Sequence, residues 1–182
     1  MKVVGVVGLP ASGKGEFSKI AAAMDIPVIV MGDMIRNAVK DGGIDPTDAN
    51  LGAMANRLRA ERGMDAIAQL CVPEIRHQTA PIVLVDGIRG DAEVSTFRGI
   101  FPGFTLISID SSFETRLARI QARGRSDDFA SDDELRRRDT RELGWGLGNA
   151  LREADIHLAN NGTLAVFAAD VRNLLASLGR DP

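Results

Sequence analysis

The sequence is poor in the residues that build disulfide frameworks and metal clusters. It contains one cysteine, Cys71, and two histidines, His77 and His157, among 182 residues. A single cysteine excludes an internal disulfide, and these three residues are too few for a Cys/His zinc site. Chains without disulfides are typical of reducing compartments, so we expect a cytoplasmic protein.

Long apolar runs and long runs of one charge are also missing. Stretches such as Ile26 to Met31 and Pro81 to Val85 are far shorter than the ~18 residues that a membrane span needs. The 22 basic and 25 acidic residues give a net charge of −3 and form no basic arm. We therefore expect no membrane partner, and the composition argues against nucleic acid. Gly5 and Gly8 interrupt the N-terminal apolar run, which favours a strand over a signal peptide.

What the sequence does contain is an alternation of short apolar runs with segments of helical periodicity. With 45% hydrophobic side chains, we expect one domain over residues 1–182. Apolar runs without polar alternation are typical of strands covered on both faces, which predicts an α/β fold of three layers (α/β/α) around a five-stranded parallel sheet. The expected strands are Val3–Val7, Val28–Met31, Ile82–Val85, Leu106–Ile109 and Ile156–Leu158, and the expected helices are Gly13–Met24, Ser112–Arg123 and Leu164–Leu178.

Between the second and third expected strands lies a helix-rich stretch at about residues 33–78. It is too long for a single crossover, so we expect an insertion that covers a substrate. Ser111 followed by Glu114 fits a capping box and predicts the start of the helix over residues 112–123.

The sequence GLPASGKG at Gly8–Gly15 fits the G-x-x-x-x-G-K pattern between an expected strand and an expected helix. Glycines let consecutive backbone N–H groups point at phosphate oxygens, and the following helix adds its positive N-terminus. Lys14 would add a cation for the β- and γ-phosphates, so we expect ATP with Mg²⁺. The expected phosphate-binding residues are Gly8, Leu9, Pro10, Ala11, Ser12, Gly13, Lys14 and Gly15.

Position 15 is unusual, because most such loops have a Ser or Thr there whose oxygen binds Mg²⁺. The GKG sequence resembles the loop of adenylate kinases and other nucleoside monophosphate kinases. This resemblance implies a metal held largely through water and phosphate. Glu16 replaces the threonine usual in those kinases, and we expect its carboxylate to turn away from the phosphates.

Two further stretches strengthen the resemblance to nucleoside monophosphate kinases. MGDMIR at Met31–Arg36 is similar to their GDMLR segment, and VDGIR at Val85–Arg89 is similar to their DGFPR. The resemblance implies that Asp86 orients the metal or its water shell and that Arg36 and Arg89 bind the acceptor. A solvated helix position is the alternative for Arg36. Since parallel sheets bind ligands beyond the carboxyl ends of their strands, four residues should converge near the P-loop. They are Asp33, Arg36, Asp86 and Arg89.

Residues of about 123–138 resemble the short lid of UMP/CMP-type kinases, in which RSDD precedes a helix with basic residues. Arginines closing from such a segment would stabilise charge on the transferred phosphoryl group. Surface ion pairs with the neighbouring aspartates are the alternative. The candidate lid arginines are Arg123, Arg137, Arg141 and, as expected catalytic residues, Arg125 and Arg138.

The C-terminal stretch Ala154 to Leu175 resembles the end of dephospho-CoA kinases, which implies that Asn160 and Gly162 form a turn beside the adenine. In that family an aspartate after the second strand acts as a base on a ribose hydroxyl, and Asp33 is at a matching position. Taken whole, the chain resembles an archaeal group of proteins related to adenylate kinases and dephospho-CoA kinases.

These observations predict a Mg²⁺-dependent phosphotransferase that passes the ATP γ-phosphate to a small nucleotide. Arg36 and Arg89 favour an ionised phosphate acceptor, a nucleoside monophosphate, whereas Asp33 as a base would serve a hydroxyl acceptor such as dephospho-CoA. A nucleotide-binding switch or regulatory ATPase with a macromolecular partner is the alternative from another class. Trp145, in the RELGWG stretch, is either a base-stacking or lid-hinge residue or an aromatic residue that packs a helix on the sheet.

Overall fold

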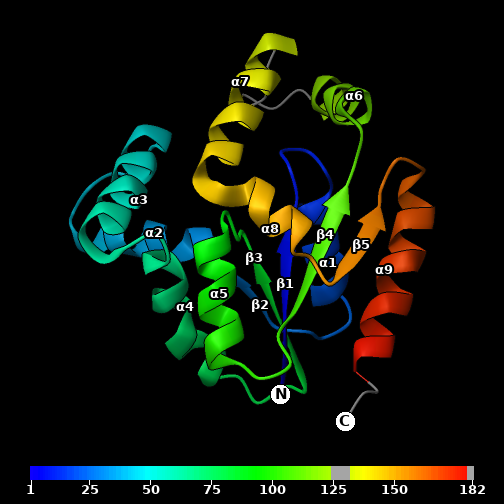
Figure 1. Ribbon diagram of the computed structural model, residues 1–182, viewed down its shortest axis with the longest axis horizontal. Helices are drawn as coiled ribbons and strands as arrows, with labels where there is room; N and C mark the ends of the chain where they lie inside the picture. Colours follow the sequence, from blue (N-terminus) through cyan, green and yellow to red (C-terminus); the bar gives the residue numbers. More distant parts are fainter. Residues whose placement is uncertain (124–131, 180–182) are drawn as a thin grey trace.

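A five-stranded parallel sheet forms the centre of the structure, a computed structural model that describes residues 1–123 and 132–179. The strand order is β2-β3-β1-β4-β5, so β1 lies in the middle between β3 and β4 (Figure 1). The strands are β1 (Lys2–Val7), β2 (Val28–Val30), β3 (Ile82–Asp86), β4 (Thr105–Asp110) and β5 (Ile156–Ala159). The predicted parallel sheet is confirmed.

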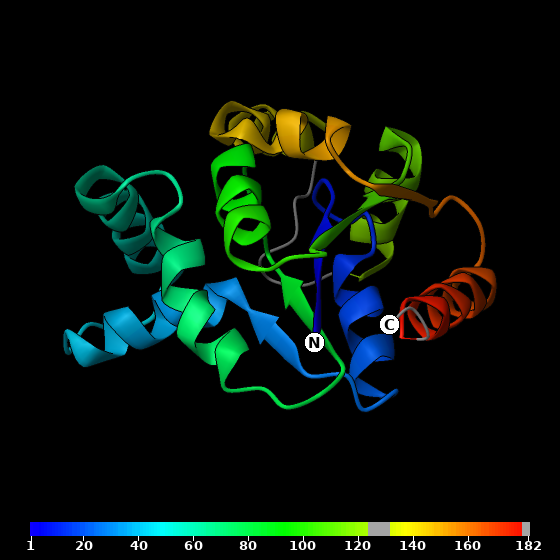
Figure 2. The ribbon, with the colours of Figure 1, turned by 60° about the horizontal axis from the view of Figure 1, so that its bottom comes forward.

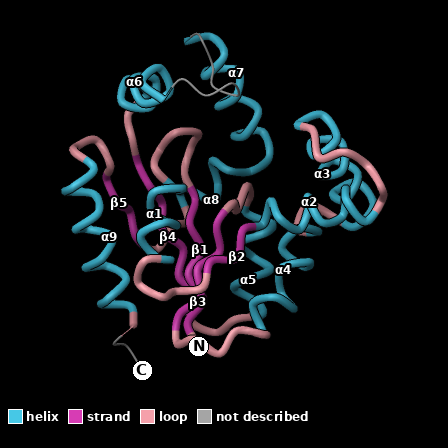
Figure 3. The backbone as a smooth tube through the Cα atoms, turned by 180° about the vertical axis from the view of Figure 1, so that it is seen from behind, coloured by secondary structure: helices cyan, strands magenta, loops and turns pink. Residues whose placement is uncertain are grey.

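Helices cover both faces of this sheet, as views from opposite sides show (Figures 1 and 3). Side chains alternate along a strand, so Val4 and Val6 of β1 pack with Phe17 and Phe167 on one face, while Val3 lies in the buried cluster of the other face. The helices are α1 (Lys14–Ala22), α2 (Met31–Asp41), α3 (Asp48–Arg62), α4 (Ala66–Arg76), α5 (Asp91–Ile100), α6 (Phe113–Arg123), α7 (Asp132–Glu142), the π-helical segment η1 (Leu143–Leu147), α8 (Gly148–Arg152) and α9 (Leu164–Leu178). Helices α1 and α9 cover the first face, and α4, α5 and α8 contribute to the second.

The predicted helical insertion is formed by α2, α3 and α4, which lie together beside the β2 edge of the sheet (Figure 2). It begins earlier than expected, because Met31 is the first residue of α2 and not the last of a strand. Met31 is nevertheless buried in the same cluster as the sheet residues. An apolar residue at a strand-to-helix junction satisfies both patterns, so the sequence alone did not separate them.

The start of α6 also differs from the predicted capping box. The hydroxyl of Ser112, and not that of Ser111, accepts a hydrogen bond from the backbone N–H of Thr115 at 3.2 Å. Ser111 instead donates to the carbonyl oxygens of Ser12, at 3.1 Å, and Asn160, at 2.6 Å. One serine therefore caps the helix, while its neighbour ties the strand ends together.

The segments expected to bind ligand gather at the carboxyl ends of the strands. The loop between β1 and α1 lies there, below α6 and α7 (Figure 1). Among the described residues, no helix is both long and apolar enough to cross a bilayer.

Candidate phosphate-binding site

At two positions of the loop from β1 to α1, only glycine fits. Gly13 has φ 117°, in the left-handed region, and a Cβ there would collide with Nδ2 of Asn160. A Cβ at Gly8 would collide with the hydroxyl of Ser12. The two glycines of the motif are thus required by close contacts across the loop and by its curvature.

Two arginines and an asparagine donate hydrogen bonds to the backbone carbonyls of this loop. Arg119 of α6 donates to the carbonyl of Ser12 at 3.2 Å and to the carbonyl of Asn160 at 2.9 Å, and Asn160 Nδ2 donates to Ser12 at 2.8 Å. Arg116 donates to the carbonyl of Pro10 at 3.1 Å and forms a two-pronged ion pair with Asp139 of α7. Asn160, expected beside the adenine, is buried and fixes the loop, while Gly162 lies exposed in the following turn.

The arginines of α6 were missed by the sequence reasoning. Their spacing of three residues, which puts Arg116 and Arg119 on one helix face, was the available signal. Burial lowers the pKa of Arg119 below its ordinary value, and its carbonyl partners come from two loops far apart in the chain. The phosphate-binding loop is therefore held in place by side chains more than a hundred residues away in sequence.

Lys14 lies at the centre of a charged cluster. Its Nζ donates to the carbonyl oxygens of Gly8 and Leu9, the latter at 3.1 Å. Burial and, next, the nearby Arg89 guanidinium lower the pKa of Lys14 from 10.5 to about 8, whereas the carboxylates of Glu142 and Asp86 oppose both effects. The charged groups around it are Arg89, Glu142, Asp86 and Arg138. The structure thus brings together Lys14, Asp86, Arg89 and Arg138.

Glu142, at the end of α7, is the acidic member that sequence reasoning did not find. Its side chain is only 2% exposed, and its Oε1 accepts from Arg89 at 2.8 Å and from Arg138 at 3.0 Å. Burial alone would raise the pKa of Glu142, but Arg89, Lys14 and Arg138 hold it below its ordinary value. A buried carboxylate thus joins the two arginines beside Lys14.

Asp86 ends β3 and is held by α1. The hydroxyl of Ser18 donates to Asp86 Oδ2 at 2.7 Å. Ser18 lies one helical turn beyond Lys14, so both side chains project from the same face of α1. No atom lies within 4 Å of a Cβ built on Gly15, so there is open space beside the loop at that position. A carboxylate with a nearby hydroxyl and phosphate oxygens is the donor set that Mg²⁺ prefers, so these residues fit the metal.

Asp33 and Arg36 do not join this cluster in the structure. They form an ion pair with each other on α2, and their side chains are about half exposed, at 51% and 50%. Glu16 pairs with Lys19 at 2.7 Å on the solvent side of α1, in agreement with the expected orientation of its carboxylate. Arg125 lies outside the described residues.

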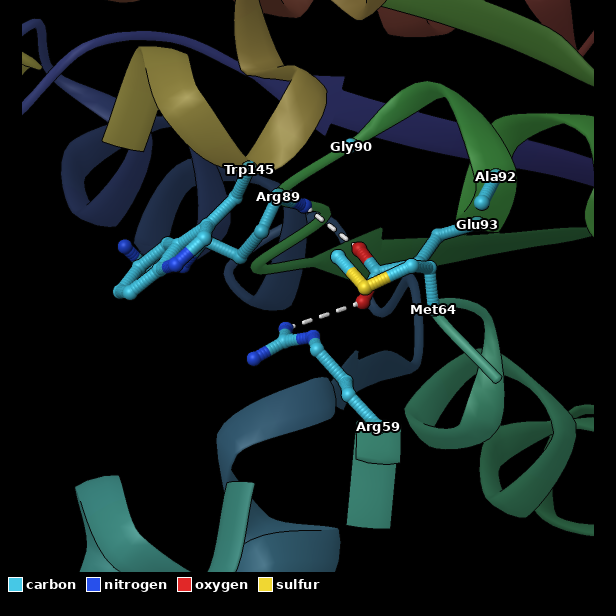
Figure 4. Close-up of a pocket in the computed structure, with 7 residues that line it drawn as sticks. All are labelled: Arg59, Met64, Arg89, Gly90, Ala92, Glu93 and Trp145. Atoms are coloured by element: carbon cyan, nitrogen blue, oxygen red, sulfur yellow. Dashed lines mark hydrogen bonds and ion pairs between the residues drawn. The ribbon is translucent and has the colours of Figure 1, made fainter. Parts of the chain in front are cut away.

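A small hollow beside Arg89 is flanked by Trp145 (Figure 4). Arg59 crosses from α3 and donates to the buried carboxylate of Glu93 at 3.2 Å, and the backbone N–H of Arg89 donates to the same carboxylate at 2.6 Å. The guanidinium groups of Arg59 and Arg141 each lie 5.6 Å from the Trp145 ring centroid. Trp145 therefore packs on charged side chains and does not belong to the buried clusters of the sheet.

Comparisons with known proteins find relatives in sequence and in fold. A family model described as an AAA domain matches residues 7–136. A UPF0200 protein from Methanoregula boonei is 66% identical over 182 residues and covers 100% of both chains. Two solved structures share the fold. TT1252 from Thermus thermophilus has a TM-score of 0.69 and 18% identity, with 97% of each chain covered. A gluconokinase from Sinorhizobium meliloti has a TM-score of 0.56 and 19% identity, with 98% of this chain and 93% of the other covered.

These findings confirm the resemblance to P-loop kinases and to archaeal proteins that the sequence suggested. The match to the AAA domain model spans the phosphate-binding loop, the helical insertion and the first turn of α7. The chain belongs to the UPF0200 family and has the α/β fold of P-loop kinases.

Proposed function

We propose that the chain is a Mg²⁺-dependent phosphotransferase that passes the γ-phosphate of ATP to a small nucleotide, with a nucleoside monophosphate as the preferred acceptor. The observation that carries this proposal is the convergence of Lys14, Arg89 and Arg138 beside Asp86. Phosphoryl transfer needs charge stabilisation and positioning more than covalent help from the protein. Three cations beside a phosphate-binding loop, with the Asp86 carboxylate for a metal, would supply both.

The donor side is formed by the loop and Lys14. Loop N–H groups and the N-terminus of α1 would bind the phosphates of ATP, as such loops do. Lys14 now donates to loop carbonyls at Gly8 and Leu9, which keeps its ammonium group at the mouth of the loop. A triphosphate would replace these neutral carbonyl acceptors with anionic phosphate oxygens. Anionic oxygens are stronger hydrogen-bond partners for a cation such as Lys14.

The metal would be held by Asp86 and by the phosphates, with Ser18 fixing the Asp86 carboxylate. When bound, Mg²⁺ neutralises charge on the phosphate oxygens and helps align donor and acceptor. Position 15 has no side-chain oxygen, and the Ser18 hydroxyl contacts Asp86. Ser18 is thus proposed to orient the carboxylate that the metal or its water shell uses.

The acceptor side is assigned to Arg89. It follows β3 by three residues, and its guanidinium faces the Lys14 cluster from the loop before α5. A planar guanidinium suits a phosphate acceptor, which is already ionised and needs no base. A hydroxyl acceptor would need one, and Asp33 is engaged with Arg36 at the surface. This contrast favours a nucleoside monophosphate over a dephospho-CoA-like acceptor.

An acceptor panel tests the proposal. Nucleoside monophosphates, nucleosides and dephospho-CoA are each incubated with ATP and Mg²⁺, and ADP formation is compared with the rate without acceptor. Stimulation by a nucleoside monophosphate, absent in Lys14→Ala, supports the proposal. Stimulation only by dephospho-CoA or a nucleoside would transfer the assignment to a hydroxyl acceptor. Tight ATP binding with no stimulation by any acceptor would favour the switch or regulatory ATPase.

A further inference from the structure

Glu142 places a negative charge among the cations that are proposed to bind phosphate. Its buried Oε1 accepts from Arg89 on one side and from Arg138 on the other, at 2.8 Å and 3.0 Å. Lys14 is close enough for the Glu142 charge to raise its pKa against the effect of burial. A single carboxylate therefore offsets positive charge on three residues of the candidate site.

We infer that Glu142 is an internal anion that competes with substrate phosphate for Arg89 and Arg138. This inference rests on the proposed function, because it takes both arginines to be phosphate ligands. A phosphate between the arginines would meet the Glu142 carboxylate, and two anions in one buried site repel each other. Only a ligand with further contacts, such as those at the P-loop, overcomes that repulsion. Glu142 thereby discriminates against simple anions, including inorganic phosphate.

The backbone after Glu142 provides a way for the carboxylate to withdraw. Glu142 is the last residue of α7, and the π-helical segment Leu143–Leu147 follows directly. Gly146 within this segment has φ 93°, which breaks the helix between α7 and α8. In this proposal the end of α7 shifts at this break, while α8, whose Ala150 is buried, stays packed on the sheet.

Trp145 makes this displacement measurable. It is the sole tryptophan of the sequence, three residues after Glu142, and it lies in the π-helical segment. Its ring lies 5.6 Å from the guanidinium groups of Arg59, on α3, and Arg141, on α7. A shift of the end of α7 changes the surroundings of the indole, so Trp145 fluorescence reports the withdrawal of Glu142.

The test compares binding of inorganic phosphate to the wild type and to Glu142→Gln by calorimetry and by Trp145 fluorescence. The glutamine keeps the shape of the side chain and removes its charge, so inorganic phosphate should bind about tenfold more tightly or better. Glu74→Gln, an exposed position on α4, is the control for the change in net charge and should bind phosphate like the wild type. Glu142→Asp, which keeps the charge, should also retain weak binding.

Loss of a buried charge between two arginines also destabilises the fold. Thermal unfolding with and without phosphate covers this case, since phosphate should raise the Tm of Glu142→Gln more than that of the wild type. Equal or weaker phosphate binding by Glu142→Gln, with no larger gain in Tm, would overturn the inference. If that result is found and the wild type binds ATP, the proposed function stands and only the inference about Glu142 fails. If the wild type binds no ATP, both fail.

Discussion

The hydroxyl of Ser18 donates to Asp86 Oδ2 at 2.7 Å, across 68 residues of sequence. The hydroxyl that Gly15 lacks at the P-loop is thus found one turn further along α1, where it holds the carboxylate at the end of β3. The site keeps a hydroxyl and a carboxylate side by side although the usual Ser or Thr of the loop is missing.

Ser18→Ala is expected to weaken the Mg²⁺-dependent part of ATP binding. One hydrogen bond to a carboxylate contributes roughly 1 to 2 kcal/mol, so the affinity for Mg·ATP should fall by about fivefold to thirtyfold. ATP affinity without the metal should change little, because Ser18 contacts Asp86 and not the loop. Calorimetric titrations of ATP with Mg²⁺ and with EDTA separate the two contributions.

Introducing the missing hydroxyl provides the matched variant. A side chain at Gly15 has free space around its Cβ, so Gly15→Ser can be accommodated. Added to Ser18→Ala, it should restore part of the lost Mg·ATP affinity. An equal loss of ATP affinity with Mg²⁺ and with EDTA would show that Ser18 acts on the fold and not on the metal.

ATP binding should weaken as the pH rises through about 8, because the pKa of Lys14 is lowered from 10.5 to about 8 by burial and by Arg89. Below that pH the ammonium form is already present, and above it ATP must bind together with a proton. The measurement is ATP affinity at about pH 7 and about pH 9.5, values on either side of the shifted pKa.

Two variants control for this effect. Lys14→Arg keeps a permanent charge, so its ATP affinity should lose the pH dependence even if it is weaker overall. Lys14→Ala should lose ATP binding while its thermal unfolding remains cooperative. ATP affinity that is unchanged in Lys14→Ala would remove the loop from the nucleotide site.

Asp33→Asn distinguishes the two kinds of acceptor. If Asp33 were the base for a hydroxyl acceptor, turnover should fall by ~10² or more. Since Asp33 pairs with Arg36 at the surface, we expect instead a nearly unchanged kcat with a modest rise in the acceptor KM. Steady-state kinetics with the acceptor found in the panel provide both constants, and wild-type values of both would remove Asp33 from the site.

Arg89→Lys should weaken the acceptor by ~1 to 3 kcal/mol and leave ATP affinity nearly untouched, because lysine keeps the charge and loses the planar fork. The acceptor KM and the ATP affinity of this variant are the two quantities to compare. The variant also shortens the reach to Glu142, whose Oε1 lies 2.8 Å from Arg89. Thermal unfolding serves as the check that the fold survives. Equal weakening of ATP and acceptor would make Arg89 a donor-side residue.

The sheet and the P-loop could be predicted because their signals are local. Apolar runs without alternation indicate buried parallel strands, and Gly8, Gly13 and Lys14 are spaced for one loop. Asp86 could be placed because it ends a strand beside β1. These inferences need only the order of residues along the chain and the geometry of parallel sheets.

The rest of the site depends on tertiary pairing. Glu142 meets Arg89 from a helix 53 residues further on, and nothing in RELGWG marks that glutamate as buried. Asp33 and Arg36 are three apart on a helix, a spacing that allows the pair seen in the structure. The sequence therefore allowed an Asp33–Arg36 ion pair as an alternative to two site residues. Only the position of α2 in the fold decides between the two.

The decisive measurement of the proposed phosphotransferase activity is the transfer of a labelled γ-phosphate from ATP. The protein is incubated with Mg²⁺, γ-labelled ATP and the nucleoside monophosphates, and the label is followed into products. We expect the label to appear in a nucleoside diphosphate, at a rate that depends on the acceptor, and we expect no transfer in Lys14→Ala. Label released only as inorganic phosphate, at the same rate with and without acceptor, would contradict the proposed activity.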